Sequence, residues 1–453
     1  MSAKNLVDWP LVGLIFKSPI LLNGLRVAVL LLFASAVYFG LTYPDKEENP
    51  YTLAIFWSLF WPFFLVISMV SLGPVFCSVC PHSFIGKHLN RMGPKKLMPN
   101  WMRNRWWGLG LLVVSYWIPV YVFPEFLKTP FVSAIYFLVL TVIAFLGFYL
   151  YRNMDYCRYG CPIGSVIKSF GKVGFARLET DQSDCKTCRS FDCVKSCEWN
   201  LRPYLFESKN NMQDCTLCMD CQHACDSVQW NVGSFARQIS QPVKQLDRMT
   251  VWVFITLLAV ITMTMRFHHA LGHSPIKSDL PWVQFGYWLE GVMPAIPMID
   301  WVGFSALSMA FVMTFALVLG GFYLASKIAK IEYWSFFDQA GLALGALMLI
   351  GSLSHIGSFF FLHYAPNLGN AFYWLVDSNS VMEPMASRKD VWVHLFNLFN
   401  YLAVIVSAVI LFKKIKLFGL KGGQLVMTYL SAGSIIWVYL GLVILTQWAR
   451  SLH

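Results

Sequence analysis

The sequence predicts an all-α, polytopic membrane protein whose helical bundle is interrupted by one polar insert. Of the 453 residues, 57% are hydrophobic and only 13% are charged, whereas soluble domains carry about 25% charged residues. The apolar residues gather into long continuous runs, as they do in membrane spans. All twelve cysteines precede residue 226, and ten of them lie in the polar stretch. These observations exclude an ordinary soluble enzyme domain.

About nine runs are long and apolar enough to cross a bilayer, whose hydrocarbon core needs about 20 helical residues. They lie near residues 20–41, 52–73, 106–123, 130–150, 249–265, 302–325, 339–361, 393–412 and 426–446. The chain is therefore expected to divide into an N-terminal segment of about four helices, the insert and a C-terminal segment of about five. These parts occupy residues 1–150, 151–248 and 249–453.

Basic side chains gather in alternate loops. The loop after the second run contains no acid, and its bases are Lys87, Arg91, Lys95, Lys96, Arg103 and Arg105; later loops carry Lys327, Lys330, Lys413, Lys414, Lys416 and Lys421. Since such residues are retained on the cytoplasmic side, the N-terminus and the insert are predicted to be cytoplasmic and the C-terminus external, in a bacterial or archaeal cytoplasmic membrane. This bias accounts for the net charge of +11, so membrane lipid is an expected partner and nucleic acid is not.

Eight of the ten cysteines of the insert form two runs, at residues 185–197 and 215–225. The first reads C-x2-C-x4-C-x3-C and the second C-x2-C-x2-C-x3-C. The second is the bacterial ferredoxin run, in which three close thiolates hold one 4Fe–4S cluster and the fourth reaches its neighbour. Two clusters are therefore expected, one on Cys185, Cys188, Cys193 and Cys225, the other on Cys215, Cys218, Cys221 and Cys197. Structural zinc prefers separated CxxC pairs, and disulfides are rare in a reducing cytoplasm.

The other four cysteines form two pairs, each predicted to lie at the cytoplasmic end of a span. Cys77 and Cys80 stand in CSVCP, and Cys157 and Cys161 stand in CRYGCP. Aligning the two Cys–Pro steps also aligns Lys87 with Lys168, which indicates a repeated unit of two helices and a cysteine pair. The four thiolates could hold a third iron–sulfur centre or act as redox dithiols. The alternative is buried structural cysteines in a helix-terminating proline turn.

Together these motifs resemble a family of membrane-bound polyferredoxins. The family includes the membrane subunit that feeds periplasmic nitrate reductase, the electron donor of nitrous oxide reduction and an accessory protein of cbb3 oxidase assembly. Its members pair membrane-edge C-x3-C-P motifs with a cytoplasmic two-cluster ferredoxin insert; CRYGCP matches this motif, and CSVCP is one residue shorter. The resemblance covers roughly residues 20–265. It implies electron transfer from a quinol or a cytoplasmic donor toward an acceptor at the outer face.

Most of the ten histidines follow the insert, near the predicted outer ends of the spans. They are His268, His269, His273, His355, His363 and His394. His355 lies within the seventh run and His394 opens the eighth, so two antiparallel helices could present both imidazoles to a haem b. The group of His268, His269 and His273, with Met263 and Met265, would suit a metal such as copper. The alternative is interfacial histidines solvated by lipid headgroups.

Three functions remain open at this point, and the residues single out no catalytic group. The leading hypothesis is an electron relay between a cytoplasmic or quinol donor and a partner reductase or respiratory complex. The second is a copper reductase or an assembly factor for a respiratory metalloenzyme. The third is a structural iron–sulfur subunit of a larger respiratory complex. The expected cofactors are two 4Fe–4S clusters, joined by a third iron–sulfur centre, haem b or copper at the further sites.

Overall fold

The computed structural model describes residues 4–123, 125–170, 173–206, 212, 214–233, 247–294, 298–377 and 380–451, which are mostly helical. The chain divides into two compact units. The first comprises residues 1–110, 127–238 and 359–388, and the second comprises residues 111–126, 239–358 and 389–453. The first unit therefore joins most of the predicted N-terminal membrane segment to the insert.

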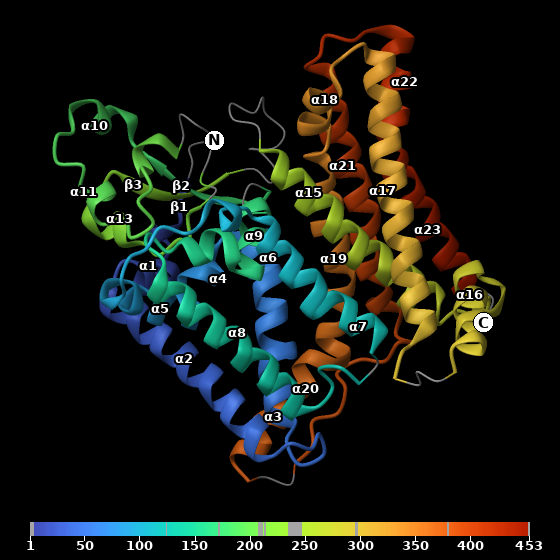
Figure 1. Cartoon of the computed structure of the whole chain (residues 1–453), viewed down its shortest axis with the longest axis horizontal. Helices are drawn as coiled ribbons and strands as arrows, with labels where there is room; N and C mark the ends of the chain where they lie inside the picture. The colour runs from blue at the N-terminus through green and yellow to red at the C-terminus, as the bar shows by residue number, and fades with distance from the viewer. Residues whose placement is uncertain are drawn as a thin grey trace. The chain divides into compact units, whose positions relative to one another are not determined.

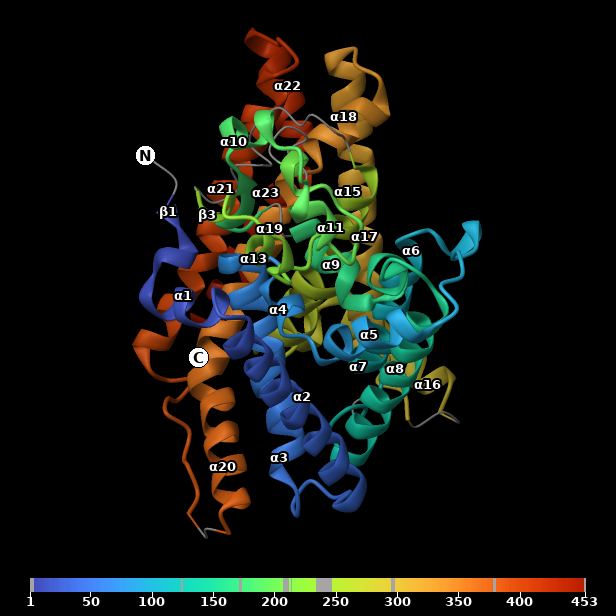
Figure 2. The ribbon, with the colours of Figure 1, turned by 90° about the vertical axis from the view of Figure 1, so that its left-hand side faces the viewer.

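The membrane helices of the first unit are built around α2 (Pro19–Thr42) and α8 (Pro130–Leu150), which pack side by side (Figure 1). Each begins at a proline that follows a hydroxyl cap, Ser18 or Thr129, because proline at the first helical position gives up an N–H that would be unpaired anyway. The other elements are α1 (Pro10–Phe16), α3 (Pro50–Leu53), α4 (Val75–Ser78), α5 (Pro81–Met92), α9 (Pro162–Phe170) and α20 (Ala365–Leu375), with π-helical segments at Ala54–Phe60, Phe63–Leu72, Tyr156–Gly160 and Phe360–Tyr364 and 3-10 turns at Leu6–Asp8, Asn100–Met102 and Pro203–Leu205. Helix α20 lies against α3 (Figure 2).

Two strands of the insert and one strand from the start of the chain form a three-stranded antiparallel sheet. Its order is β1 (Lys4–Asn5), β3 (Val228–Val232) and β2 (Ala176–Thr180), with short helices α10 (Gln182–Thr187), α11 (Asp192–Lys195) and α13 (Asp220–Ala224) beside it (Figure 1). Trp230 of β3 is fully buried and meets the ring of Phe16 edge-on, with ring centroids 5.0 Å apart. The sheet thus fastens the cysteine-bearing loops to the start of the chain.

The second unit is organised around α17 (Trp301–Ala329), which packs against α16 (Pro281–Val292) and α22 (Gly422–Ala432) (Figure 1). Its remaining elements are α7 (Ile118–Val122), α15 (Arg248–Leu257), α18 (Tyr333–Ala340), α19 (Ala343–Phe359), α21 (Leu398–Lys416) and α23 (Ser434–Ser451), with π-helical segments at Val113–Trp117, Leu258–Met263 and Met265–Leu271 and 3-10 turns at Lys277–Asp279 and Val391–Asn397. Helix α6 (Trp106–Leu112) begins in the first unit and ends in the second.

Among the described residues, six helices are long and apolar enough to cross a membrane, or seven if the pair α22 and α23, bent by 58°, counts as one span. This is the architecture of a multi-pass membrane protein. Two of the runs predicted as spans form shorter apolar helices, Pro50–Phe60 and Trp106–Val122; both runs contain an internal proline, which removes a helical hydrogen bond. The run near 339–361 lies inside one longer helical stretch, Tyr333–Leu375. The side of the membrane on which the insert lies stays a prediction.

Candidate metal centres

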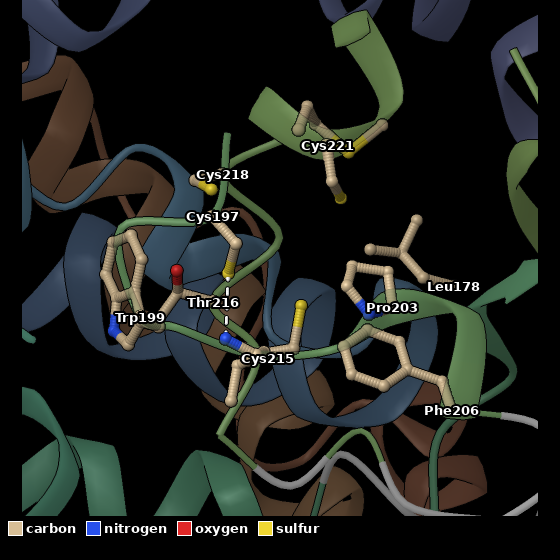
Figure 3. Close-up of a pocket in the computed structure, with 11 residues that line it drawn as sticks. Leu178, Cys197, Trp199, Pro203, Phe206, Cys215, Thr216, Cys218 and Cys221 are labelled. Atoms are coloured by element: carbon tan, nitrogen blue, oxygen red, sulfur yellow. Dashed lines mark hydrogen bonds between the residues drawn. The ribbon is translucent and has the colours of Figure 1, made fainter. Parts of the chain in front are cut away.

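A small hollow lies between four thiols of the insert. Its lining includes Cys197, Cys215, Cys218 and Cys221, and Figure 3 shows their side chains around it. These are the four residues predicted to share one cluster, three from the second run and the last from the first. Burial raises the pKa of Cys218 to about 12. A buried thiolate is stable only with positive charge beside it. Iron ions would provide that charge.

Backbone N–H groups and an unusual backbone conformation surround this hollow. The N–H of Leu201 donates to Cys197 Sγ at 3.4 Å (dashed line in Figure 3), and the N–H of Leu217 donates to Cys215 Sγ at the same distance. Leu217 and Met219 both have left-handed φ angles, 51° and 66°. Such backbone costs on the order of 1–3 kcal/mol per residue, and it forms the anion-binding concavities found at iron–sulfur sites.

The polar groups of the lining fit the same ligand. The hydroxyl of Thr216, on the wall of the hollow, is buried and has no hydrogen-bond partner. A buried donor without a partner is costly in a folded core, whereas the sulfur atoms of an anionic cluster accept such bonds. The residues present therefore fit a 4Fe–4S cluster.

The other four thiols of the two runs also lie together. Burial, together with the neighbouring thiols of Cys225, Cys185 and Cys188, raises the pKa of Cys193 to about 11. Cys193 also adds to the rise in the pKa of Cys221, which lines the hollow. The two groups of four thiols are therefore neighbours. The structure thus brings the eight cysteines together as the two predicted sets, with Cys197 and Cys225 exchanged between the runs. Their role as ligands stays a prediction.

The four membrane-edge cysteines share one site. Burial raises the pKa of Cys77 well above its usual value, and the thiols of Cys80, Cys161 and Cys157 add to the rise, while the ammonium of Lys168 opposes it. Thiols that influence one another in this way lie close together. Two chain segments about eighty residues apart in the sequence therefore meet at a single cluster of sulfur atoms.

Each Cys–Pro step begins a helix. Helix α5 starts at Pro81 and α9 at Pro162, and a short helical segment ends just before each step, at Ser78 and at Gly160. The preceding thiols face the free N–H groups of the first turn: the N–H of Gly164 donates to Cys161 Sγ at 3.3 Å, and burial raises the pKa of Cys80 to about 12 although the N–H of Ser83 lowers it. The positive end of a helix favours the thiolate form.

Local helix geometry absorbs the one-residue difference between CSVCP and CRYGCP. Cys77 lies in the regular turn of α4, whereas Cys157 lies in the π-helical turn Tyr156–Gly160. There the N–H of Cys161 donates to the carbonyl of Tyr156, five residues back, at 2.8 Å. A π-helical turn holds one residue more than an α-helical turn. The shorter motif therefore does not prevent the four thiols from meeting.

Two lysines at equivalent positions of the repeat hold the second cysteine run of the insert. Lys87 Nζ lies 2.5 Å from a carboxylate oxygen of Asp220, and Lys168 Nζ lies 3.0 Å from one of Asp214. Asp214 and Asp220 directly precede the first and third cysteines of that run. Each half of the membrane repeat is therefore tied by an ion pair to one side of the insert's second run. The alignment of the two Cys–Pro steps predicted that the two lysines are equivalent, but it did not predict their aspartate partners.

An arginine inside a span bridges the two cysteine sites. Arg26 of α2 donates from Nε to the carbonyl of Ser78 and from Nη2 to the carbonyl of Cys218, both at 2.8 Å. Ser78 stands between the first pair of membrane-edge cysteines, and Cys218 lines the hollow of the insert. An ionised side chain in an apolar run marks a functional site by default. The sequence signal for this role is that Arg26 is the one charged residue within the apolar run 20–41.

Changing Asp214 to Asn should destabilise the first unit. The side chain of Lys168 is 4% exposed, and loss of its carboxylate partner leaves a buried charge uncompensated, which costs about 3 kcal/mol. We expect a clearly lower thermal midpoint in detergent, followed by circular dichroism. Adding Lys168→Met to Asp214→Asn should recover part of the loss, because no unpaired ammonium remains.

The matched control is Asp8→Asn. Asp8 pairs with Lys17 at 3.1 Å on the surface, with both side chains more than half exposed, and such pairs contribute less than about 1 kcal/mol. Equal effects of Asp214→Asn and Asp8→Asn would contradict a structural role for the buried pair.

Three of the histidines after the insert form a compact group. One ligand atom from each of His268, His269 and His273 lies within 4.8 Å of the others. The ring of His355 stacks on that of His269 at 6.5 Å, while His394 is exposed in the 3-10 turn Val391–Asn397. The binding of haem b by His355 and His394 stays a prediction. The role of Met263 and Met265 as copper ligands also stays a prediction, and Met263 is fully buried.

Comparison with known proteins bears on the membrane-edge site. Residues 53–100 and 134–177 match a family model described as a 4Fe-4S binding domain. The matched stretches contain the four membrane-edge cysteines and stop before the two cysteine runs of the insert. The chain therefore carries a 4Fe-4S binding domain, which supports iron–sulfur binding and an electron-transfer role.

Two curated relatives come from the archaeon Methanocaldococcus jannaschii. The uncharacterized protein MJ0750 is 25% identical over 178 residues, which cover 36% of this chain and 72% of the relative. The uncharacterized protein MJ0749 is 28% identical over 101 residues, which cover 22% of this chain and 38% of the relative. No solved structure matches the chain.

Proposed function

We propose that this protein relays single electrons between a donor at the insert and an acceptor in or across the membrane. The acceptor would be a quinone or a partner redox enzyme, as the resemblance to membrane polyferredoxins implies. We further propose that the insert is cytoplasmic and binds two 4Fe–4S clusters, and that the four membrane-edge cysteines bind a third. The observation that carries the proposal is the direct linkage of the two cysteine sites through Arg26, Lys87 and Lys168.

When bound, 4Fe–4S clusters supply reversible one-electron chemistry whose potential depends on charge, hydrogen bonds and burial. The chain's own residues set these conditions. Lys87 opposes the rise in the pKa of Cys218, and Lys168 opposes that of Cys77, so each cysteine site has a cation beside it. Arg26 fixes the distance between the two loops because it donates to both. The ion pairs keep the insert from separating from the membrane repeat.

The relay can be tested with the full chain in liposomes that contain a lipid-soluble quinone. After chemical reduction under anaerobic conditions, the wild-type protein should pass electrons to the quinone. The variant Cys77→Ala/Cys161→Ala should lose most of this transfer, because the membrane-edge site is the part of the chain that connects the insert to the lipid. Reoxidation is followed by low-temperature EPR of the insert's clusters.

A second acceptor provides the control. Ferricyanide is soluble in water and reaches the insert directly, so it should reoxidise both proteins at similar rates. A variant that still reduces the quinone as fast as the wild type would overturn the relay. The same result would favour a structural iron–sulfur subunit, whose clusters need no path to the membrane.

A further inference from the structure

The helix that begins at Arg248 ends in a turn that carries three imidazoles. Its last segment is π-helical, Met265–Leu271, and contains His268 and His269. The ring centroids of these two lie 4.8 Å apart, and the ring of His273 lies 6.0 Å from the first and 6.2 Å from the second. One nitrogen from each ring falls within 4.8 Å of the others. Three ligand atoms so close together can meet one metal ion after small rotations of the side chains.

Gly272 makes this arrangement possible. Its N–H donates to the carbonyl of Phe267 at 2.9 Å, and the chain then turns so that His273 comes back beside the helix end. A Cβ at position 272 would lie 2.3 Å from the carbonyl oxygen of His268, a distance that real Cβ atoms do not adopt. Only glycine therefore permits this close turn.

His268 is held in the orientation typical of a metal ligand. Its Nε2 lies 3.6 Å from a carboxylate oxygen of Asp300, and its Nδ1 is buried and has no hydrogen-bond partner. Histidine ligands of metals usually donate their other nitrogen to a carboxylate, which fixes the ring and the tautomer. A buried, unpaired imidazole nitrogen is otherwise unfavourable. The free nitrogen is thus the one available to the group.

Asp300 is itself fixed from two sides. Its Oδ1 accepts the N–H of Gly303 at 2.7 Å at the start of α17, and its own N–H donates to the carbonyl of Val122 at 2.7 Å. The ring of Tyr121 lies 5.6 Å from that of His268. The carboxylate therefore cannot turn away without breaking the cap of α17, so Asp300 is a positioning residue for His268.

We propose that His268, His269 and His273 form a binding site for one divalent first-row transition-metal ion. An all-nitrogen set of three imidazoles that leaves further positions open suits Zn²⁺ and Cu²⁺ and does not suit Mg²⁺ or Ca²⁺. The site is independent of the iron–sulfur relay, because none of its residues belongs to a cysteine site. His269 and His273 are exposed, so an ion can enter from solvent.

The test measures Zn²⁺ binding to the full-length protein, purified anaerobically without a polyhistidine tag and with its iron intact. Titration against a fluorescent zinc chelator should show one site per chain that Mg²⁺ does not compete for. His273→Ala should remove this site and leave the fold intact, because the side chain of His273 is exposed. Asp300→Asn should weaken binding by about 10- to 100-fold, since it removes the group that orients a ligand.

Two further variants separate the site from non-specific binding. Gly272→Ala should abolish the site without removing a ligand, while the iron content stays at the wild-type value. His363→Ala removes a histidine of the other unit, which contacts Phe359, and should leave binding unchanged. Equal zinc affinity and stoichiometry in the wild type, His273→Ala and Gly272→Ala would overturn the proposal. The same titrations with Cu²⁺ should show tighter binding in the wild type and the same losses in the variants. The EPR spectrum of bound Cu²⁺ should show nitrogen hyperfine coupling from three imidazoles.

Discussion

Replacing Cys193 and Cys225 together by Ala should remove no more iron than replacing either one alone. Each single variant is expected to lose about four iron atoms per chain, because both residues belong to the same 4Fe–4S cluster. The double variant Cys193→Ala/Cys197→Ala should instead lose about eight, although these two cysteines stand in one run of the sequence. Residues that serve one cluster act as a unit, so their effects do not add.

Iron and acid-labile sulfide per chain, measured after anaerobic purification, decide between the two arrangements. If each run bound its own cluster, the pattern would reverse: Cys193→Ala/Cys197→Ala would lose one cluster and Cys193→Ala/Cys225→Ala would lose two. Alanine is preferred to serine because a serine oxygen can replace a thiolate as an iron ligand. The structure argues for the crossed arrangement, since the hollow is lined by Cys197 together with Cys215, Cys218 and Cys221.

The cysteine sets could be anticipated because their signal is local. Three thiolates within one short loop reflect the size of the cluster that they bind, and that spacing is legible in any single sequence. The long apolar runs are equally local, and they predicted the multi-pass character of the chain. Runs interrupted by Pro62 or Pro119 were less well described, because a proline inside a helix changes its continuity without changing its composition.

The contacts that join the sites could not be predicted in the same way. Asp214 and Asp220 are ordinary acids in the sequence, and only the fold pairs them with Lys168 and Lys87. The short strand β1 lies at the start of the chain, far in sequence from the insert, and pairs with β3. The π-helical turn at Tyr156–Gly160 accommodates the extra residue of CRYGCP relative to CSVCP. The spacing of the cysteines alone does not reveal this turn.

The histidines show the same limit. The joint ligation of haem b by His355 and His394 stays a prediction, and the ring that stacks on His355 in the structure is that of His269. The group of His268, His269 and His273 was visible as a cluster in the sequence. The carboxylate of Asp300, which orients His268, lies about thirty residues further along the chain and carried no local signal.

We propose above all that the four membrane-edge cysteines hold a third 4Fe–4S cluster beside the two of the insert. Three features support it: the four thiols influence one another, N–H groups at the starts of α5 and α9 face Cys80 and Cys161, and the matching 4Fe-4S binding model covers this site. A pair of redox dithiols would use the same cysteines without iron, so the iron content separates the two interpretations.

The most direct measurement is iron per chain in the wild type and in Cys77→Ala/Cys161→Ala, which removes one thiol from each pair and leaves the insert intact. We predict about twelve iron atoms in the wild type and about eight in the variant, because one cluster of three is lost. The EPR signals of the insert should persist in both proteins. About eight iron atoms in both proteins, with identical spectra, would contradict the third cluster and leave the membrane-edge cysteines without iron.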